Sequence, residues 1–277
     1  MQGKLSYSMT KADPWLRVRS GLCSCAVLCV VAPSWASTGI RPLFEPTDLE
    51  LEDPGVVDFD FQLGVIRGRD PWRVVIPDFE FDFGVTRNVE LDLDGTYAIQ
   101  GTSHSPFTSP QAVPDALWTS VKLGLLDWYN GDTKRAWAFG LQLGPKFPVA
   151  KGNQGVGAEG LLLSGLALGD THFVLNTGMR IDPRPSPDAQ RPVGIEVGLD
   201  IHTSLDHRDR YAFLGEISGV RYLSDYPHEL LTTAGLQMSP TKYLDMSIVA
   251  LWGWLGGSDR YGLLLGVSPK IRILGSD

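Results

Sequence analysis

The feature that most constrains this chain is a two-residue alternation of apolar and polar side chains, which begins near Val57 and recurs almost to the C-terminus. Phe59 and Phe61, for example, alternate with Asp58 and Asp60. Because successive side chains of a β-strand point to opposite faces, each run has one apolar and one polar face. About twelve such runs of roughly ten residues are typical of a β-barrel that spans a membrane.

The runs predict one all-β domain over 56–274, an antiparallel up-and-down transmembrane β-barrel of about 12 strands. Their separators alternate between short turns, such as 86–88 and 169–170, and longer loops rich in Pro, Ser and Gly, such as 100–115 and 182–192. Outer-membrane barrels show this parity, with tight turns on the periplasmic side. We expect strands at 56–66, 73–85, 89–99, 116–127, 134–147, 156–168, 171–181, 193–205, 210–223, 229–238, 243–254 and 260–273.

Residues 1–36 have the pattern of a cleaved secretion signal, with either Met1 or Met9 as the start. Basic residues precede a short apolar core at 21–31, and Ser34-Trp35-Ala36 offers small residues where signal peptidase reads them. The core is well short of the roughly 20 residues of a transmembrane anchor. Residues 37–55 then form a polar periplasmic lead-in. The signal and the barrel together predict the outer membrane of a Gram-negative bacterium.

Composition excludes several classes of function. All three cysteines, Cys23, Cys25 and Cys29, lie in the predicted signal, so we expect no disulfide and no cysteine-bound metal in the mature chain. That chain carries 20 basic and 31 acidic side chains, a net charge of −11. An acidic protein is poorly suited to nucleic acid, which attracts clustered Lys and Arg. We therefore expect no nucleic-acid partner.

Catalytic motifs are absent from the sequence. It has no HExxH zinc pattern and no Gly-x-Ser-x-Gly elbow. The closest approach to a catalytic constellation is His202, Asp206, His207 and Asp209, which fall at a predicted turn where polar residues usually contact water. We expect no enzyme activity, no catalytic residue, no metal and no cofactor.

The polar face of the first three predicted strands is densely acidic. We expect its carboxylates to line the lumen, mostly toward the periplasmic mouth, with Arg87, Lys122 and Arg180 as counter-charges. Three interpretations stay open: a solvated wall with scattered salt bridges, selection for cations, and a divalent-cation site, for which no calcium-loop spacing is present. The carboxylates are Asp58, Asp60, Asp78, Glu80, Asp82, Glu90, Asp92 and Asp94.

Other positions extend the barrel hypothesis. Aromatic residues near strand ends, among them Trp118 and Tyr222, predict an interfacial girdle. The segments 230–231 and 249–252 are apolar on both faces, which predicts a partly filled interior.

A soluble β-sandwich would show the same alternation, so a substitution is needed to separate the two folds. Arg at Phe81 or Leu265 should impair membrane insertion, by about 2–4 kcal/mol at mid-bilayer. Arg at Gln142 or Gly198 should be milder.

Two stretches go beyond pattern. The segment 44–62, FEPTDLELEDPGVVDFDFQ, and the segment 76–91, with IPDFEF and GVTRNVEL, resemble a family of bacterial outer-membrane proteins named for the MetA pathway of phenol degradation. The likeness is close over about 44–100. It implies a membrane barrel with a transport or channel role, and it implies no catalytic residue. The chain departs from many such barrels at its last five residues, ILGSD, which lack the terminal aromatic residue that barrel assembly machinery reads.

Together these observations predict an outer-membrane channel or transporter for small molecules, with aromatic or hydrophobic compounds as candidate permeants. Its expected partners are outer-membrane lipid and the barrel assembly machinery. Two alternatives stay open: a barrel enzyme that acts on envelope lipid, and a secreted or periplasmic β-sandwich that binds a ligand.

Overall fold

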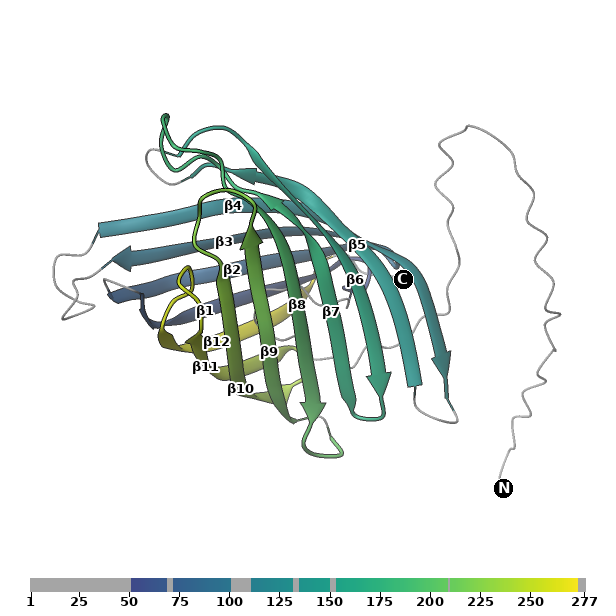
Figure 1. The fold of residues 1–277 in the computed structure, drawn as a ribbon. Coiled ribbons are helices and arrows are strands. Elements are labelled where there is room, and N and C mark those ends of the chain that lie inside the picture. The colour runs from purple at the N-terminus through teal and green to yellow at the C-terminus, as the bar shows by residue number, and fades with distance from the viewer. Residues whose placement is uncertain are drawn as a thin grey trace, which may run out of the picture. The chain divides into compact units, whose positions relative to one another are not determined.

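The structure is a computed structural model that describes residues 51–68, 72–100, 111–131, 135–149, 153–208 and 210–273. Its strands form one closed antiparallel barrel, in which each strand pairs with its neighbours in sequence and β1 pairs with β12 (Figure 1). The predicted 12-stranded up-and-down barrel is confirmed. The strands are β1 (Val56–Arg67), β2 (Trp72–Thr86), β3 (Val89–Gln100), β4 (Gln111–Asn130), β5 (Arg135–Phe147), β6 (Gly157–Leu168), β7 (Thr171–Ile181), β8 (Val193–Ser204), β9 (Tyr211–Tyr222), β10 (Glu229–Thr241), β11 (Leu244–Gly253) and β12 (Tyr261–Arg272).

Ten of these strands agree with their predicted bounds to within one residue at each end. The two exceptions are β4, predicted at 116–127, and β10, predicted at 229–238. Each runs past its predicted bounds through a proline, Pro114 in β4 and Pro240 in β10. Both prolines lie at a shift of the pairing register, between Gly95 and Tyr97 for β4 and between Met238 and Thr241 for β10. Proline, which has no N–H to donate, is tolerated at such irregularities.

The two ends of the barrel differ in their connections. Val56 pairs with Arg272, so β1 begins and β12 ends at the same end. This short-turn end carries tight connections such as 87–88, 169–170 and 242–243, whereas the opposite, long-loop end carries 182–192 and 254–260. The predicted signal and most of the predicted lead-in lie outside the described residues. In the described part of the chain, no helix is both long and apolar enough to cross a membrane.

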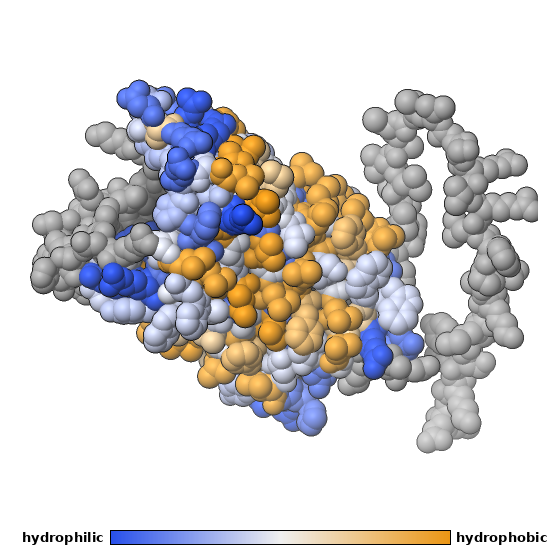
Figure 2. All heavy atoms as spheres, viewed as in Figure 1, coloured by the Kyte–Doolittle hydropathy of each residue, from blue (hydrophilic) through white to orange (hydrophobic). Residues whose placement is uncertain are grey.

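The outer face is a broad apolar surface over the strands (Figure 2). Large side chains on it are half exposed, including Met179 at 53%, Leu263 at 50% and Leu265 at 53%. Water tolerates such a continuous surface poorly, while hydrocarbon solvates it well. The alternation therefore places its apolar side chains against lipid. Further members are Leu63, Leu91, Leu143, Leu162, Leu175, Ile195, Val197, Ile217, Leu236, Ile248 and Val267.

The inner face is mainly polar and largely screened from water. Gln142, Asn176 and Asp200 each have at most 1% of their surface exposed. Two apolar clusters also lie inside the barrel wall, and the first includes Leu231 and Leu251 from the segments predicted to be apolar on both faces. One contains Val75, Leu251 and Leu264, with Ile66 and Leu231 packed against it. The other contains Trp118, Leu161 and Leu163.

The aromatic girdle is only partly as predicted. Trp128, Trp252 and Trp254 are exposed near strand ends, at 53%, 60% and 63%. Trp118 and Tyr222, by contrast, are buried at 4% and 8% exposure and face inward, so their assignment to the girdle is wrong. Position near a strand end does not determine the face, which depends on the parity of the residue along its strand.

Candidate functional site in the barrel interior

The eight predicted carboxylates stand side by side on β1, β2 and β3. Pairing aligns Asp58 with Asp82 and Asp82 with Asp92. A second row contains Asp60, Glu80 and Asp94 in the same order of strands. Because directly opposite residues of antiparallel strands lie about 4.5–5.5 Å apart, the register forces like charges together.

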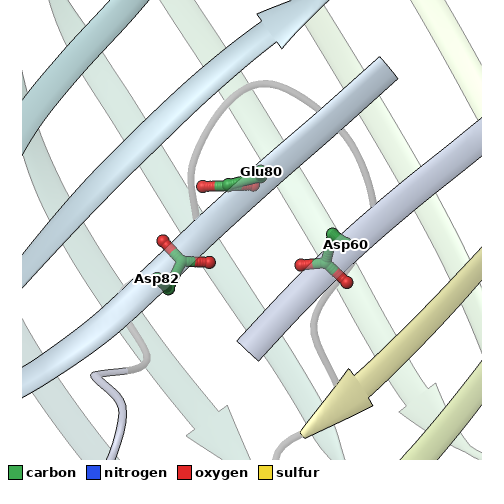
Figure 3. Close-up of side chains that lie close together, drawn as sticks. All are labelled: Asp60, Glu80 and Asp82. Atoms are coloured by element: carbon green, nitrogen blue, oxygen red, sulfur yellow. The ribbon is translucent and has the colours of Figure 1, made fainter. Parts of the chain in front are cut away.

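Two groups of three carboxylates are close enough to share a cation. In Asp60, Glu80 and Asp82, which point toward one another in Figure 3, one oxygen of each lies within 4.8 Å of the others. Asp82, Glu90 and Asp92 form a second such group. Oxygen ligands of this kind suit Ca²⁺ or Mg²⁺. Protein donors already occupy oxygens of the second group, which weakens it as a metal site.

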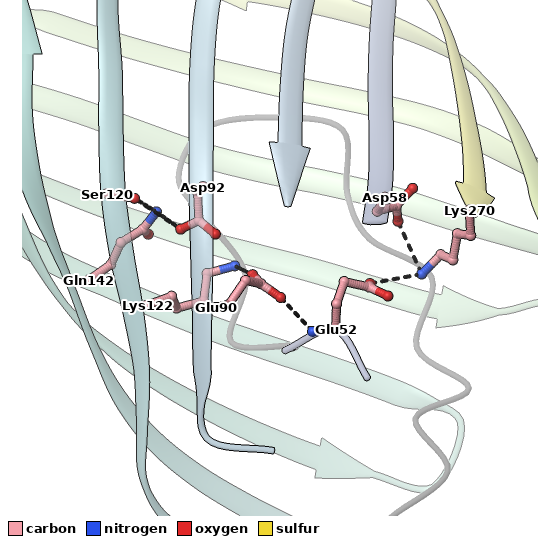
Figure 4. Close-up of polar contacts among 8 residues, drawn as sticks. All are labelled: Glu52, Asp58, Glu90, Asp92, Ser120, Lys122, Gln142 and Lys270. Carbon is pink, nitrogen blue, oxygen red and sulfur yellow. Dashed lines mark hydrogen bonds and ion pairs between the residues drawn. The ribbon is translucent and has the colours of Figure 1, made fainter. Parts of the chain in front are cut away.

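Those donors form a buried network near the short-turn end (Figure 4). Lys122 Nζ lies 2.9 Å from Glu90 Oε1, and neither side chain is exposed. Gln142 Nε2 donates to Asp92 Oδ2 at 2.8 Å, and Ser120 Oγ donates to the same oxygen at 2.9 Å. Bonds to charged groups inside a low-dielectric wall are stronger than those in water, so this network holds β3, β4 and β5 together.

A second cation at this end, Lys270, was not among the predicted counter-charges. Lys270 Nζ lies 3.1 Å from Asp58 Oδ2 and 3.2 Å from Glu52 Oε1 (Figure 4). Lys270 shares a face of β12 with Gly266 and Ser268, because alternate residues of a strand point the same way. Its inward direction could therefore be predicted from the sequence. Its partner could not be predicted in this way, because Asp58 is far away along the chain and becomes a neighbour only when β12 pairs with β1.

Glu52 belongs to a strap, residues 51–55, that crosses the inside of the short-turn end. The Glu52 N–H donates to a carboxylate oxygen of Glu90, and the Gly55 N–H donates to Gly84 O at 2.8 Å. A Cβ on Gly84 would collide with the carbonyl oxygens of Glu52 and Asp53, and Leu51 lies over Gly124. The strap therefore narrows this mouth of the barrel along β2, β3 and β4.

The other two predicted counter-charges lie elsewhere. Arg180, on β7, is 3.1 Å from Asp182 Oδ2 and 4.0 Å from Glu196 Oε2. Its guanidinium also donates to the Tyr222 hydroxyl at 3.0 Å, and that hydroxyl donates to Glu229 at 3.0 Å. Arg180 thus organises a separate network toward the long-loop end, on β7 to β10.

Two more cations belong to the charge pattern among the described residues. Lys146 Nζ is 2.6 Å from Glu159 and 3.4 Å from Asp182. Arg73 on β2 pairs with Asp259 of the loop before β12. Arg87 is exposed on the turn between β2 and β3. Of the three predicted counter-charges, Lys122 has the clear ion pair with the acidic rows.

A cavity of about 410 Å³ lies in the lumen between the acidic rows and the Arg180 network. Its wall combines both kinds of side chain: the apolar cluster around Val75, Leu251 and Leu264, and many charged groups. Two guanidiniums, Arg73 and Arg180, contribute to it. The lining carboxylates are Asp60, Asp78, Glu80, Asp94, Glu196, Glu216, Glu229 and Asp259.

The candidate catalytic constellation does not assemble. His202 is buried on the inner face of β8, with its ring centroid 5.7 Å from that of His172. Asp206 lies instead in the turn after β8, where its carboxylate accepts the Arg210 N–H at 2.7 Å and the Tyr211 N–H at 3.3 Å. His207 is exposed on that turn, and Asp209 lies outside the described residues.

Comparisons with known proteins agree on the fold. An outer membrane channel from Pseudomonas putida F1 is 9% identical and has a TM-score of 0.60, over 82% of this chain and 100% of its own. The NanC porin is 12% identical, with a TM-score of 0.57, over 77% of this chain and 100% of its own. No family model and no curated protein matches the sequence. At these identities the likeness concerns the barrel, and the resemblance to the family named for the MetA pathway stays a prediction.

Proposed function

We propose that this protein is an outer-membrane channel for small molecules in the envelope of a Gram-negative bacterium. The observation that supports this best is the combination of an apolar outer face with a polar inner face that encloses a cavity of about 410 Å³. A barrel wall of this kind is stable in lipid, and its polar inner face suits the passage of solutes. The structures that share its fold include an outer membrane channel and a porin.

The interior favours small permeants over large ones. The strap narrows the short-turn end, and the ion pairs of Lys146, Arg180 and Arg73 lie toward the long-loop end. The apolar cluster around Leu251 and Leu264 on the cavity wall supports aromatic or hydrophobic groups in the permeant. We include outer-membrane lipid and the barrel assembly machinery as partners, and we propose no enzymatic activity.

Conductance tests the channel directly. The purified protein should give discrete current steps in planar bilayers, and liposomes that contain it should swell in small solutes faster than in large ones. Boiled protein is the control for lipid leakage. Protein that inserts fully into liposomes, yet gives neither current nor swelling, would exclude the channel.

The location and orientation have a separate test. The sequence has no cysteine after Cys29, so single cysteines can be placed without background. We expect Asp188→Cys, in a long loop, to react with an impermeant maleimide on whole cells. Lys242→Cys, in a short turn, should react only after the outer membrane is opened. The reverse labelling pattern would overturn the proposed orientation.

A further inference from the structure

We infer that the lumenal cavity binds an amphipathic organic cation, an ammonium group carried on a small apolar body. This inference rests on the proposed channel function and names the class of its permeant. It is supported by the negative charge of the cavity lining, by the ion pairs that Arg73 and Arg180 already form with carboxylates, and by the position of the apolar cluster on the wall.

The lining carries eight carboxylates and two guanidiniums, a formal charge of −6. Field lines from such a set are focused by the low-dielectric wall around it, which raises the local concentration of cations and excludes anions.

Neither guanidinium is well placed to hold an anion. Arg180 lies beside the carboxylates of Asp182 and Glu196, and another of its N–H groups donates to the Tyr222 hydroxyl. Arg73 is paired with Asp259. A carboxylate-bearing ligand would have to displace these partners and would meet the other lining acids. An ammonium group, by contrast, would be attracted by the lining carboxylates without displacing either guanidinium.

The pairing register gives the site its amphipathic character. Glu216 on β9 lies opposite Thr233 on β10, and Thr233 lies opposite Leu251 on β11. Thr233 Oγ1 donates to Glu216 Oε2 at 3.3 Å, which orients that carboxylate along the wall. Two steps between strands separate the backbone of Glu216 from that of Leu251 by roughly 10 Å.

Leu251 belongs to the apolar cluster with Val75 and Leu264, and all three residues line the cavity. A ligand that lies along this row can therefore place its charge at Glu216 and its apolar body at Leu251. The volume of about 410 Å³ is in the range of small-molecule pockets, about 300–1,000 Å³, and it suits an arylalkyl amine.

Three probes of similar shape test the inference with the full-length protein in planar bilayers: 2-phenylethylammonium, 3-phenylpropanoate and 2-phenylethanol. Each is added to a potassium current, and its blocking concentration is measured. We expect the ammonium to block at a concentration at least about tenfold lower than either other probe, as loss of a charged hydrogen bond would predict. Propylammonium, which lacks the ring, should block less well than 2-phenylethylammonium.

Two isosteric substitutions locate the site. Glu216→Gln should weaken the block by 2-phenylethylammonium about tenfold while the channel still conducts potassium. Asp188→Asn, which removes the same charge from an exposed loop, should leave the block unchanged.

The outcomes separate the two hypotheses. Absence of any potassium current would contradict the channel itself. A normal current that the three probes block equally, or that 3-phenylpropanoate blocks best, would overturn the cation site alone. Equal blocking by ammonium in Glu216→Gln and Asp188→Asn would also overturn it. If Glu216→Gln does not fold, the probe series on the unaltered protein still decides.

Discussion

Lys122 Nζ lies 2.9 Å from Glu90 Oε1 inside the barrel wall, and both side chains are completely screened from solvent. The pair joins β4 to β3 at the level where the strap enters, because Glu90 also accepts the N–H of Glu52. A buried pair of this kind is stable only while both partners are present, since either charge alone lacks the water that would otherwise solvate it.

Lys122→Met should therefore destabilise the barrel by about 3–5 kcal/mol, because it leaves the Glu90 charge buried without its cation. Lys122→Met with Glu90→Gln should recover much of that loss. Urea unfolding in lipid vesicles, followed by tryptophan fluorescence, measures both. A Lys122→Met protein as stable as the unaltered protein would show that the pair contributes nothing, and a double variant no more stable than the single one would show that the unpaired Glu90 charge is not the cause of the loss.

A charge on the outer face should be far more harmful than the same charge in the lumen. Leu265→Arg should cost about 2–4 kcal/mol because it places a guanidinium in hydrocarbon. Gln142 is a poor lumenal control, since its amide bonds to Asp92 and Ser120. Ser218→Arg, on the cavity wall, is a better match. Folding yield into vesicles should fall for Leu265→Arg and stay near normal for Ser218→Arg; equal losses would contradict the assignment of faces.

The strap should respond to its contact with Gly84. A methyl group there would collide with the carbonyl oxygens of Glu52 and Asp53, so Gly84→Ala should displace the strap and increase single-channel conductance. Gly160→Ala is the matched control, because its Cβ would meet its nearest neighbours at an ordinary 3.9 Å. Unchanged conductance in a well-folded Gly84→Ala protein would mean that the strap does not limit the flow of ions.

The Asp206 turn should weaken in acid. Desolvation is the largest single influence and raises the pKa of the Asp206 carboxyl, but the N–H groups of Arg210 and Tyr211 and the Arg210 guanidinium together lower it more, to a net value below the ordinary 3.8. The folded state therefore binds this proton less readily than the unfolded state.

The stabilisation from Asp206 is consequently full above pH 3.8 and is lost as the pH falls through the lowered pKa. The difference in urea midpoint between the unaltered protein and Asp206→Ala should be constant near neutral pH and shrink in acid. A difference that persists at pH values well below the carboxyl pKa would argue against this mechanism.

Much of the interior could be predicted because the inward parity of a strand is a local property. Asp58, Asp82 and Asp92 were assigned to one face from alternation alone, and the pairing places them in one row. The same reasoning would have found Lys270, whose parity matches that of Ser268. Strand ends were harder to predict: β4 continues through Pro114, which lies at a register shift, and the sequence does not show whether a proline ends a strand or is accommodated in one.

The sequence by itself determined that the chain forms strands, how many there are, and which side chains face lipid, because these follow from a period of two that is repeated along the chain. Only the tertiary structure decided which charges meet. Lys270 reaches Asp58 because β12 closes onto β1, whereas Arg180 lies on β7 beside Glu196. Such partners depend on closure and register between strands that are distant in the chain, and a local periodicity carries no information about either.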